Sequence, residues 1–216
     1  MEKLQMKCKI HDKKRTGLQE LLMMLFVWGV IEFDGISTMI PNQVIALGLP
    51  VIIWFIGAVY IFRKMRKQND EHLYYVNTRL KDRDWLIFFF VIMGGLTIAL
   101  SNYFYAGLKP LFVRELFTGY PLYTIRNLFY YPLEVLLMLE LLIYSQREGE
   151  LLAKKAIIPW GAFALFLLWG LPHLLWHGFF DGLIASLRAF IYCIPFYVSN
   201  KNIKTSYFSM LILWFL

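Results

Sequence analysis

Six residues with ionisable side chains lie within, or at the ends of, apolar runs in the second half of this chain. They come from three consecutive runs and are Arg126, Glu134, His173, His177, Asp181 and Arg188. Ionisable groups are costly in hydrocarbon, so those found in membrane segments usually face a protein interior or a hydrated cavity. A carboxylate there can act as a general base, and a histidine can bind a metal or stabilise an oxyanion. These residue types therefore suit a hydrolytic site that activates water.

Helical spacing brings several of these residues onto common faces. Arg126 and Glu134 are eight residues apart and project from roughly the same side of a helix. His173 and His177 are four apart, and Asp181 continues their stripe one turn later. Three neighbouring helices are thus expected to direct acids, imidazoles and guanidinium groups into one pocket.

A buried ion-pair network is the alternative explanation for the same residues. Arg126 and Arg188 would then neutralise Glu134 and Asp181, and the histidines would form hydrogen bonds inside the bundle. Such a network would be structural and would need no substrate.

The pattern leaves the participation of a metal open. His173 and His177 are spaced as two zinc ligands on one helix, but Leu174 stands where an HExxH motif has its glutamate. A divalent metal such as zinc is therefore a candidate cofactor without a specific motif behind it.

The composition indicates that lipid is the solvent of much of the chain. Of the 216 residues, 59% are hydrophobic and 17% are charged, which is more apolar surface than a soluble domain of this size can hide. The net charge of +7 comes from basic residues in blocks between the apolar runs, as in the loops of membrane proteins. We therefore expect a lipid bilayer as partner, with basic loops near anionic headgroups, and no nucleic acid.

The apolar runs predict an all-α fold, a polytopic transmembrane helical bundle of about seven segments. The expected segments are 17–32, 44–62, 85–104, 122–144, 156–176, 182–198 and 207–216. The last run has ten residues and reaches about half of a ~30 Å hydrocarbon core, so we expect a truncated chain or a partly inserted helix. The stretch 145–155 is expected to be a loop in which Glu148 and Glu150 are solvated, unless the helix extends past Tyr144.

The placement of Lys and Arg gives the expected orientation. Six basic residues precede the first run and seven follow the second, whereas the loop after the third run holds only Lys109 and Arg114. Cytoplasmic loops are enriched in Lys and Arg, so we expect a cytoplasmic N-terminus in a bacterial cytoplasmic membrane. No internal repeat is visible, and residues 1–216 are expected to form one integral membrane domain that begins with a basic tail, 1–16.

A resemblance to a known family covers the second half of the chain, 122–216. Trp169 lies four residues before His173, and this segment resembles the second motif, FxxxH, of the CPBP family. That family comprises the type II CAAX prenyl proteases and bacteriocin-processing membrane enzymes. The preceding run, with YYPLEVLLMLELL, occupies the place of the first motif, a helix with paired glutamates and a downstream arginine. The apolar helix, NKNIK turn and final apolar helix after His173 follow the family's order.

The resemblance implies roles for individual residues. Glu134 would be the base that activates water, and His173, together with His177, would stabilise the developing charge. The second glutamate of the family's pair is Val135 here. The family's third motif, a later histidine with asparagine or aspartate, has no counterpart. Looser substitutes or supporting residues are Glu140, Arg147, Glu150, Arg126, Asp181 and Arg188.

The sequence therefore predicts a CPBP-like intramembrane endopeptidase that cleaves a membrane-embedded or lipidated peptide. A second hypothesis is a catalytically inactive membrane protein on the same fold, with a bacteriocin immunity or partner-binding role. A third is a small transporter whose acids and histidines relay protons. Trp169 itself is expected to be a packing aromatic rather than part of the site.

Overall fold

The computed structural model describes residues 17–37, 39–68, 82–106, 121–155, 157–176 and 178–215. The regular structure in these ranges is entirely helical, which confirms the expected all-α class. The long helices are α2 (Gly17–Ser37), α3 (Gln43–Gln68), α4 (Asp82–Ala106), α6 (Pro121–Ala153), α9 (Phe179–Val198) and α10 (Ile203–Phe215). Between α6 and α9 the chain forms three short pieces, α7 (Trp160–Leu165), η1 (Phe166–Gly170) and α8 (His173–Trp176).

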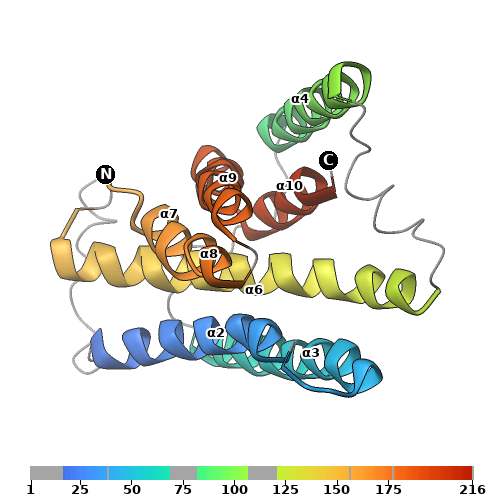
Figure 1. Cartoon of the computed structure of the whole chain (residues 1–216). Coiled ribbons are helices and arrows are strands. Elements are labelled where there is room, and N and C mark those ends of the chain that lie inside the picture. The colour runs from blue at the N-terminus through green and yellow to red at the C-terminus, as the bar shows by residue number, and fades with distance from the viewer. Residues whose placement is uncertain are drawn as a thin grey trace.

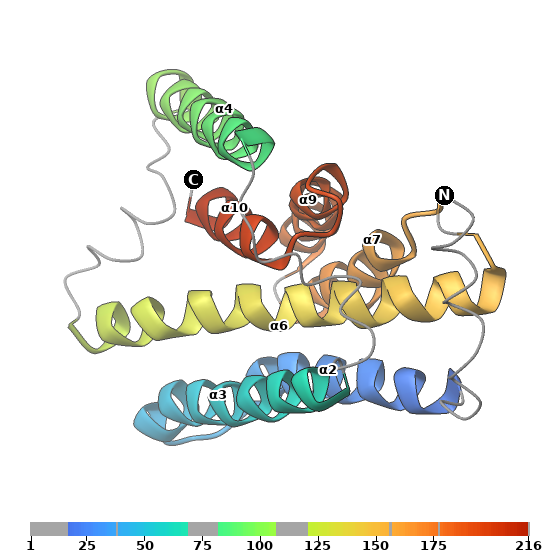
Figure 2. The ribbon, with the colours of Figure 1, turned by 180° about the vertical axis from the view of Figure 1, so that it is seen from behind.

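Helix α6 forms the axis of the molecule. Figure 1 shows α2 and α3 along one side of α6, with α7, α8, α9 and α10 on the other side. The reverse view in Figure 2 shows the same two layers, with α4 lying beyond α10. Side chains along the middle of α6, such as Leu137, Leu141 and Leu142, are fully buried. The core therefore lies on both sides of α6.

Two of the described helices are long and apolar enough to cross a membrane. They are Gln43–Lys64 of α3 and Tyr123–Glu150 of α6. The two differ in their surroundings, because most of the α6 segment is buried and most of the α3 segment is exposed. The exposed side chains of α3 include Ile52, Phe55 and Ile56. Such a surface is unfavourable in water and favourable in hydrocarbon.

Helix α6 is longer than the sequence predicts. The expected loop after Tyr144 is helical as far as Ala153, because neighbouring elements bond the polar side chains of this stretch. The Gln146 amide accepts hydrogen bonds from the Gly161 N–H (2.9 Å) and the Tyr197 hydroxyl (2.6 Å). The expectation of solvated charges is also wrong for Glu148 and Glu150, which are buried and half-buried respectively.

The fifth apolar run is broken rather than continuous. Pro172 has no N–H for a helical hydrogen bond, and the preceding turn widens so that the Leu171 N–H reaches the Phe166 carbonyl at 2.9 Å. Single π-helical turns of this kind often occur at functional sites. Gly170 lets this turn approach α9, because a Cβ atom there would lie 2.5 Å from the Ser186 Cα.

The basic tail 1–16 and the whole stretch 107–120 between α4 and α6, which includes Lys109 and Arg114, lie outside the described residues. The final helix begins at Ile203 and ends at Phe215, so it starts four residues before the expected run.

Candidate functional site

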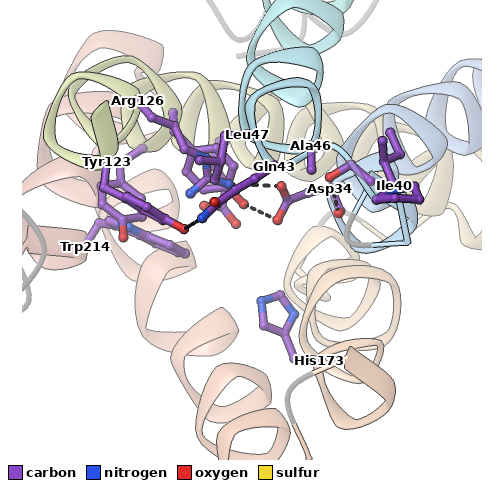
Figure 3. Close-up of a pocket in the computed structure, with 14 residues that line it drawn as sticks. Asp34, Ile40, Gln43, Ala46, Leu47, Tyr123, Arg126, His173 and Trp214 are labelled. Atoms are coloured by element: carbon purple, nitrogen blue, oxygen red, sulfur yellow. Dashed lines mark hydrogen bonds and ion pairs between the residues drawn. The ribbon is translucent and has the colours of Figure 1, made fainter. Parts of the chain in front are cut away.

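A cavity of about 540 Å³ lies among the end of α2, the start of α3, the N-terminal part of α6, α8 and the end of α10 (Figure 3). Its titratable lining residues are Asp34, Tyr123, Arg126, Tyr130, Tyr131, Glu134 and His173. Pockets that bind small molecules have volumes of roughly this size and a few convergent polar groups. The cavity is therefore the candidate site.

An ion pair occupies one wall of the cavity. Arg126 Nη2 lies 3.1 Å from Asp34 Oδ1, and the Tyr130 hydroxyl donates to Asp34 Oδ2 at 2.7 Å. The Arg126 guanidinium also stacks on the Tyr130 ring, with Cζ 4.0 Å from the ring centroid. Asp34 is thus engaged through both oxygens. In the ion-pair alternative Arg126 was expected to neutralise Glu134, and the structure instead gives it Asp34 as its partner.

The Glu134 carboxylate lies deeper in the same cavity. The side chain is 4% exposed and accepts a hydrogen bond from the Trp169 indole N–H, with Nε1 3.2 Å from Oε1. A hydrogen bond from an indole satisfies part of the hydrogen-bonding capacity of a buried carboxylate without adding a positive charge. Glu134 is therefore oriented by a neutral donor.

His173 projects from α8 toward the cavity (Figure 3). Its Nδ1 lies 2.7 Å from the Trp169 carbonyl oxygen. A carbonyl oxygen only accepts hydrogen bonds, so Nδ1 must carry the proton, and Nε2 holds the lone pair of the neutral ring. This tautomer suits a histidine that accepts a proton or a hydrogen bond through Nε2.

Four of the predicted supporting residues lie outside the cavity. Glu140 is 2% exposed in the core, and its two carboxylate oxygens have no hydrogen-bond partner among the described residues. Glu150 lies near the other end of α6, where it accepts hydrogen bonds from Gln146 (2.6 Å) and Lys201 (2.5 Å). Arg188 is exposed on α9.

Arg147 is half-buried, three residues before Glu150 on α6, and is likewise absent from the cavity lining. His177 lies outside the described residues. Asp181 belongs to α9, but its side chain is not described. The proposed roles of His177 and Asp181 therefore stay predictions.

Asp34 is a site residue that the sequence reasoning missed. It lies 92 positions before Arg126, just beyond the first expected segment, 17–32. A signal was present, because a guanidinium within an apolar run needs a counter-ion. In the expected alternation of segments, the end of the first segment and the start of the fourth segment also lie on the same side of the membrane.

The sequence reasoning also missed a contact between α2 and α8. The Trp176 indole N–H donates to Glu32 Oε2 at 3.0 Å. A Cβ atom on Gly35 would lie 2.5 Å from the Trp176 ring, so only glycine allows this approach. The first half of the chain thus holds α8, and with it His173, against the cavity.

Among the described residues, no three His, Cys, Asp or Glu side chains are grouped so that they could hold a metal ion. The described part of the cavity therefore does not fit a metal held by protein ligands alone.

No protein-family model matches the chain, and neither a curated protein nor a solved structure is significantly similar to it.

Proposed function

We propose that this chain is an integral membrane endopeptidase that resembles the CPBP family and cleaves a membrane-embedded or lipidated peptide. About seven segments would form the bundle, in a bacterial cytoplasmic membrane with the N-terminus on the cytoplasmic side. The apolar exposed surface of α3 and the blocks of basic residues between apolar runs support this arrangement.

One observation carries the proposal: Glu134 and His173 line the same cavity while Asp34 engages Arg126. A carboxylate held in an ion pair with arginine is a poor base, because the guanidinium stabilises its charged form. Asp34 provides the counter-charge for Arg126. The Glu134 carboxylate instead accepts its hydrogen bond from a neutral donor, the Trp169 indole.

The reaction follows from the properties of these groups. The Glu134 carboxylate accepts a proton from a water molecule as the water oxygen attacks the peptide carbonyl carbon. The neutral His173 ring first takes a proton from solvent at Nε2, and it then donates this N–H to the oxyanion of the tetrahedral intermediate. The carbon–nitrogen bond then breaks, and the proton held by Glu134 passes to the leaving amine.

The test is peptide cleavage by the purified chain in liposomes. A mixture of farnesylated and unmodified hydrophobic peptides would be added, and the fragments identified by mass spectrometry. Glu134→Gln and His173→Asn should each lower the cleavage rate at least ~100-fold, the usual loss when a general acid or base is removed.

Glu140→Gln is the matched control, because it neutralises a buried carboxylate on the same helix but outside the cavity. It should cleave at the wild-type rate. Thermal unfolding and gel filtration would show that all three variants remain folded. Undiminished cleavage in Glu134→Gln would exclude the catalytic role of Glu134.

A non-catalytic partner-binding protein on the same fold is the second candidate. The ion pair of Asp34 with Arg126 favours it, because this part of the cavity is already internally neutralised. It predicts that the wild-type chain binds a peptide without cleaving it, and that Glu134→Gln binds equally well. Proton-coupled flux that is lost in Glu134→Gln would instead indicate the transporter.

A further inference from the structure

Trp169 does not line the cavity but contacts two residues that do. Its side chain is 1% exposed and belongs to the π-helical turn η1. From this position it contacts both candidate catalytic residues. Its indole N–H donates to Glu134 Oε1 (3.2 Å), and its carbonyl oxygen accepts from His173 Nδ1 (2.7 Å).

These two contacts use different parts of one residue. The side chain orients an acid on α6, whereas the main chain selects the tautomer of a histidine on α8. The rings of Trp169 and His173 also pack together, with centroids 4.7 Å apart. A movement of Trp169 would therefore displace both groups at once.

The surroundings of Trp169 restrict such a movement. The Trp214 and Tyr192 rings pack against it, with centroids 5.5 and 6.0 Å away. The next residue, Gly170, lies against the backbone of α9 at Ser186. Side chains in protein cores are close-packed, so these neighbours leave little space for another position of the Trp169 ring.

We propose that Trp169 is a positioning residue, which fixes the Glu134 carboxylate through its indole N–H and the His173 tautomer through its carbonyl oxygen. This role rests on the hydrolase function proposed above.

The first test is the rate of peptide cleavage by Trp169→Phe in liposomes. Phenylalanine keeps an aromatic ring in the core and removes the indole donor. We expect kcat to fall about 10- to 30-fold while KM changes less than about twofold, because the donor orients the base and does not touch the peptide.

Trp160→Phe is the matched control. Trp160 is the first residue of α7, the helix that precedes η1. Its indole N–H donates to the Lys155 carbonyl oxygen (3.2 Å), and Trp160 does not line the cavity. It should keep the wild-type kcat. A wild-type kcat in Trp169→Phe would overturn the positioning role, even though cleavage itself was established.

The second test does not need cleavage. The chain would be labelled with ¹⁵N at the tryptophan indoles, and the Trp169 signal identified by its absence in Trp169→Phe. This signal should move in Glu134→Ala and stay in place in Glu140→Ala, because only Glu134 accepts the indole hydrogen bond.

The two tests separate the two proposals. If the wild-type chain cleaves no peptide but the indole signal moves in Glu134→Ala, the hydrolase proposal is wrong and the contact stands as an orienting contact of a binding cavity. If the signal does not move in Glu134→Ala, the positioning role is wrong whatever the chain cleaves.

Discussion

The two ends of α6 carry polar clusters of opposite character. Near its C-terminal end, Gln146 is fully buried and makes four hydrogen bonds: it donates to Glu150 and the Ile158 carbonyl, and accepts from Gly161 and Tyr197. Two donors and two lone pairs are all that a glutamine amide has. Near the N-terminal end, polar groups line a cavity of about 540 Å³.

The difference separates a structural cluster from a candidate functional one. A fully satisfied buried network fixes the packing of its elements and leaves no capacity for a ligand. The groups around Glu134 and His173 instead border a cavity. Burial of polar residues in an apolar helix is therefore a weaker sign of function than the cavity that they line.

The largest change in stability is expected from Gln146→Leu. The substitution removes the acceptor of the Gly161 N–H and of the Tyr197 hydroxyl, and each buried unpaired group costs about 1–3 kcal/mol. The Ile158 carbonyl keeps its hydrogen bond from the Trp160 N–H (2.9 Å). We expect the free energy of unfolding to fall by about 3 kcal/mol or more, measured by denaturant unfolding in detergent.

Gln43→Leu is the control for this variant. Gln43 is exposed and makes a hydrogen bond to the Tyr123 hydroxyl (2.8 Å) at the other end of α6. It should lower the free energy of unfolding by about 1 kcal/mol at most. Equal losses of unfolding free energy in Gln146→Leu and Gln43→Leu would contradict the distinction between the fully hydrogen-bonded cluster around Gln146 and the polar groups that line the cavity.

An intermediate effect is expected from Asp34→Asn. Arg126 and Glu134 share a face of α6, so an arginine without its counter-ion is expected to turn toward Glu134. If the chain is the endopeptidase proposed above, the cleavage rate should then fall about tenfold, which corresponds to about 1.4 kcal/mol in activation free energy. The measurement is the liposome cleavage assay.

The double variant Asp34→Asn, Arg126→Gln tests the cause. Removing the guanidinium should restore most of the lost rate, because Glu134 no longer has a cation to pair with. A double variant that is as slow as Asp34→Asn would show that Asp34 acts in some other way.

The smallest effect is expected from Lys201→Met. Its ion pair with Glu150 is partly exposed, with side-chain exposures of 23% and 18%, and such pairs contribute about 0–1 kcal/mol. Thermal unfolding should show a shift near the limit of detection, and cleavage should be unchanged. A loss as large as that of Gln146→Leu would mean that the ion pair, rather than the glutamine, holds this end of α6.

Local patterns in the sequence determined the helical class and the positions of the helices. Apolar runs and 3.6-residue periodicity depend on neighbours along the chain, so they gave the approximate positions of α2, α3, α4, α6, α9 and α10. The same periodicity placed Arg126 and Glu134 on one face of α6, and both line the cavity. His173 stood out as an ionisable side chain within an apolar run.

The tertiary structure decided which of these groups meet. Asp34 reaches Arg126 across 92 positions of chain, and Trp169 reaches Glu134 across 35. Both contacts depend on the packing of separate helices, which no periodicity specifies. The extension of α6 to Ala153 has the same origin, because Gly161 and Tyr197 supply the partners that make Gln146 stable inside the bundle. Sequence sets the faces of single helices, whereas contacts between helices depend on packing that only the folded chain provides.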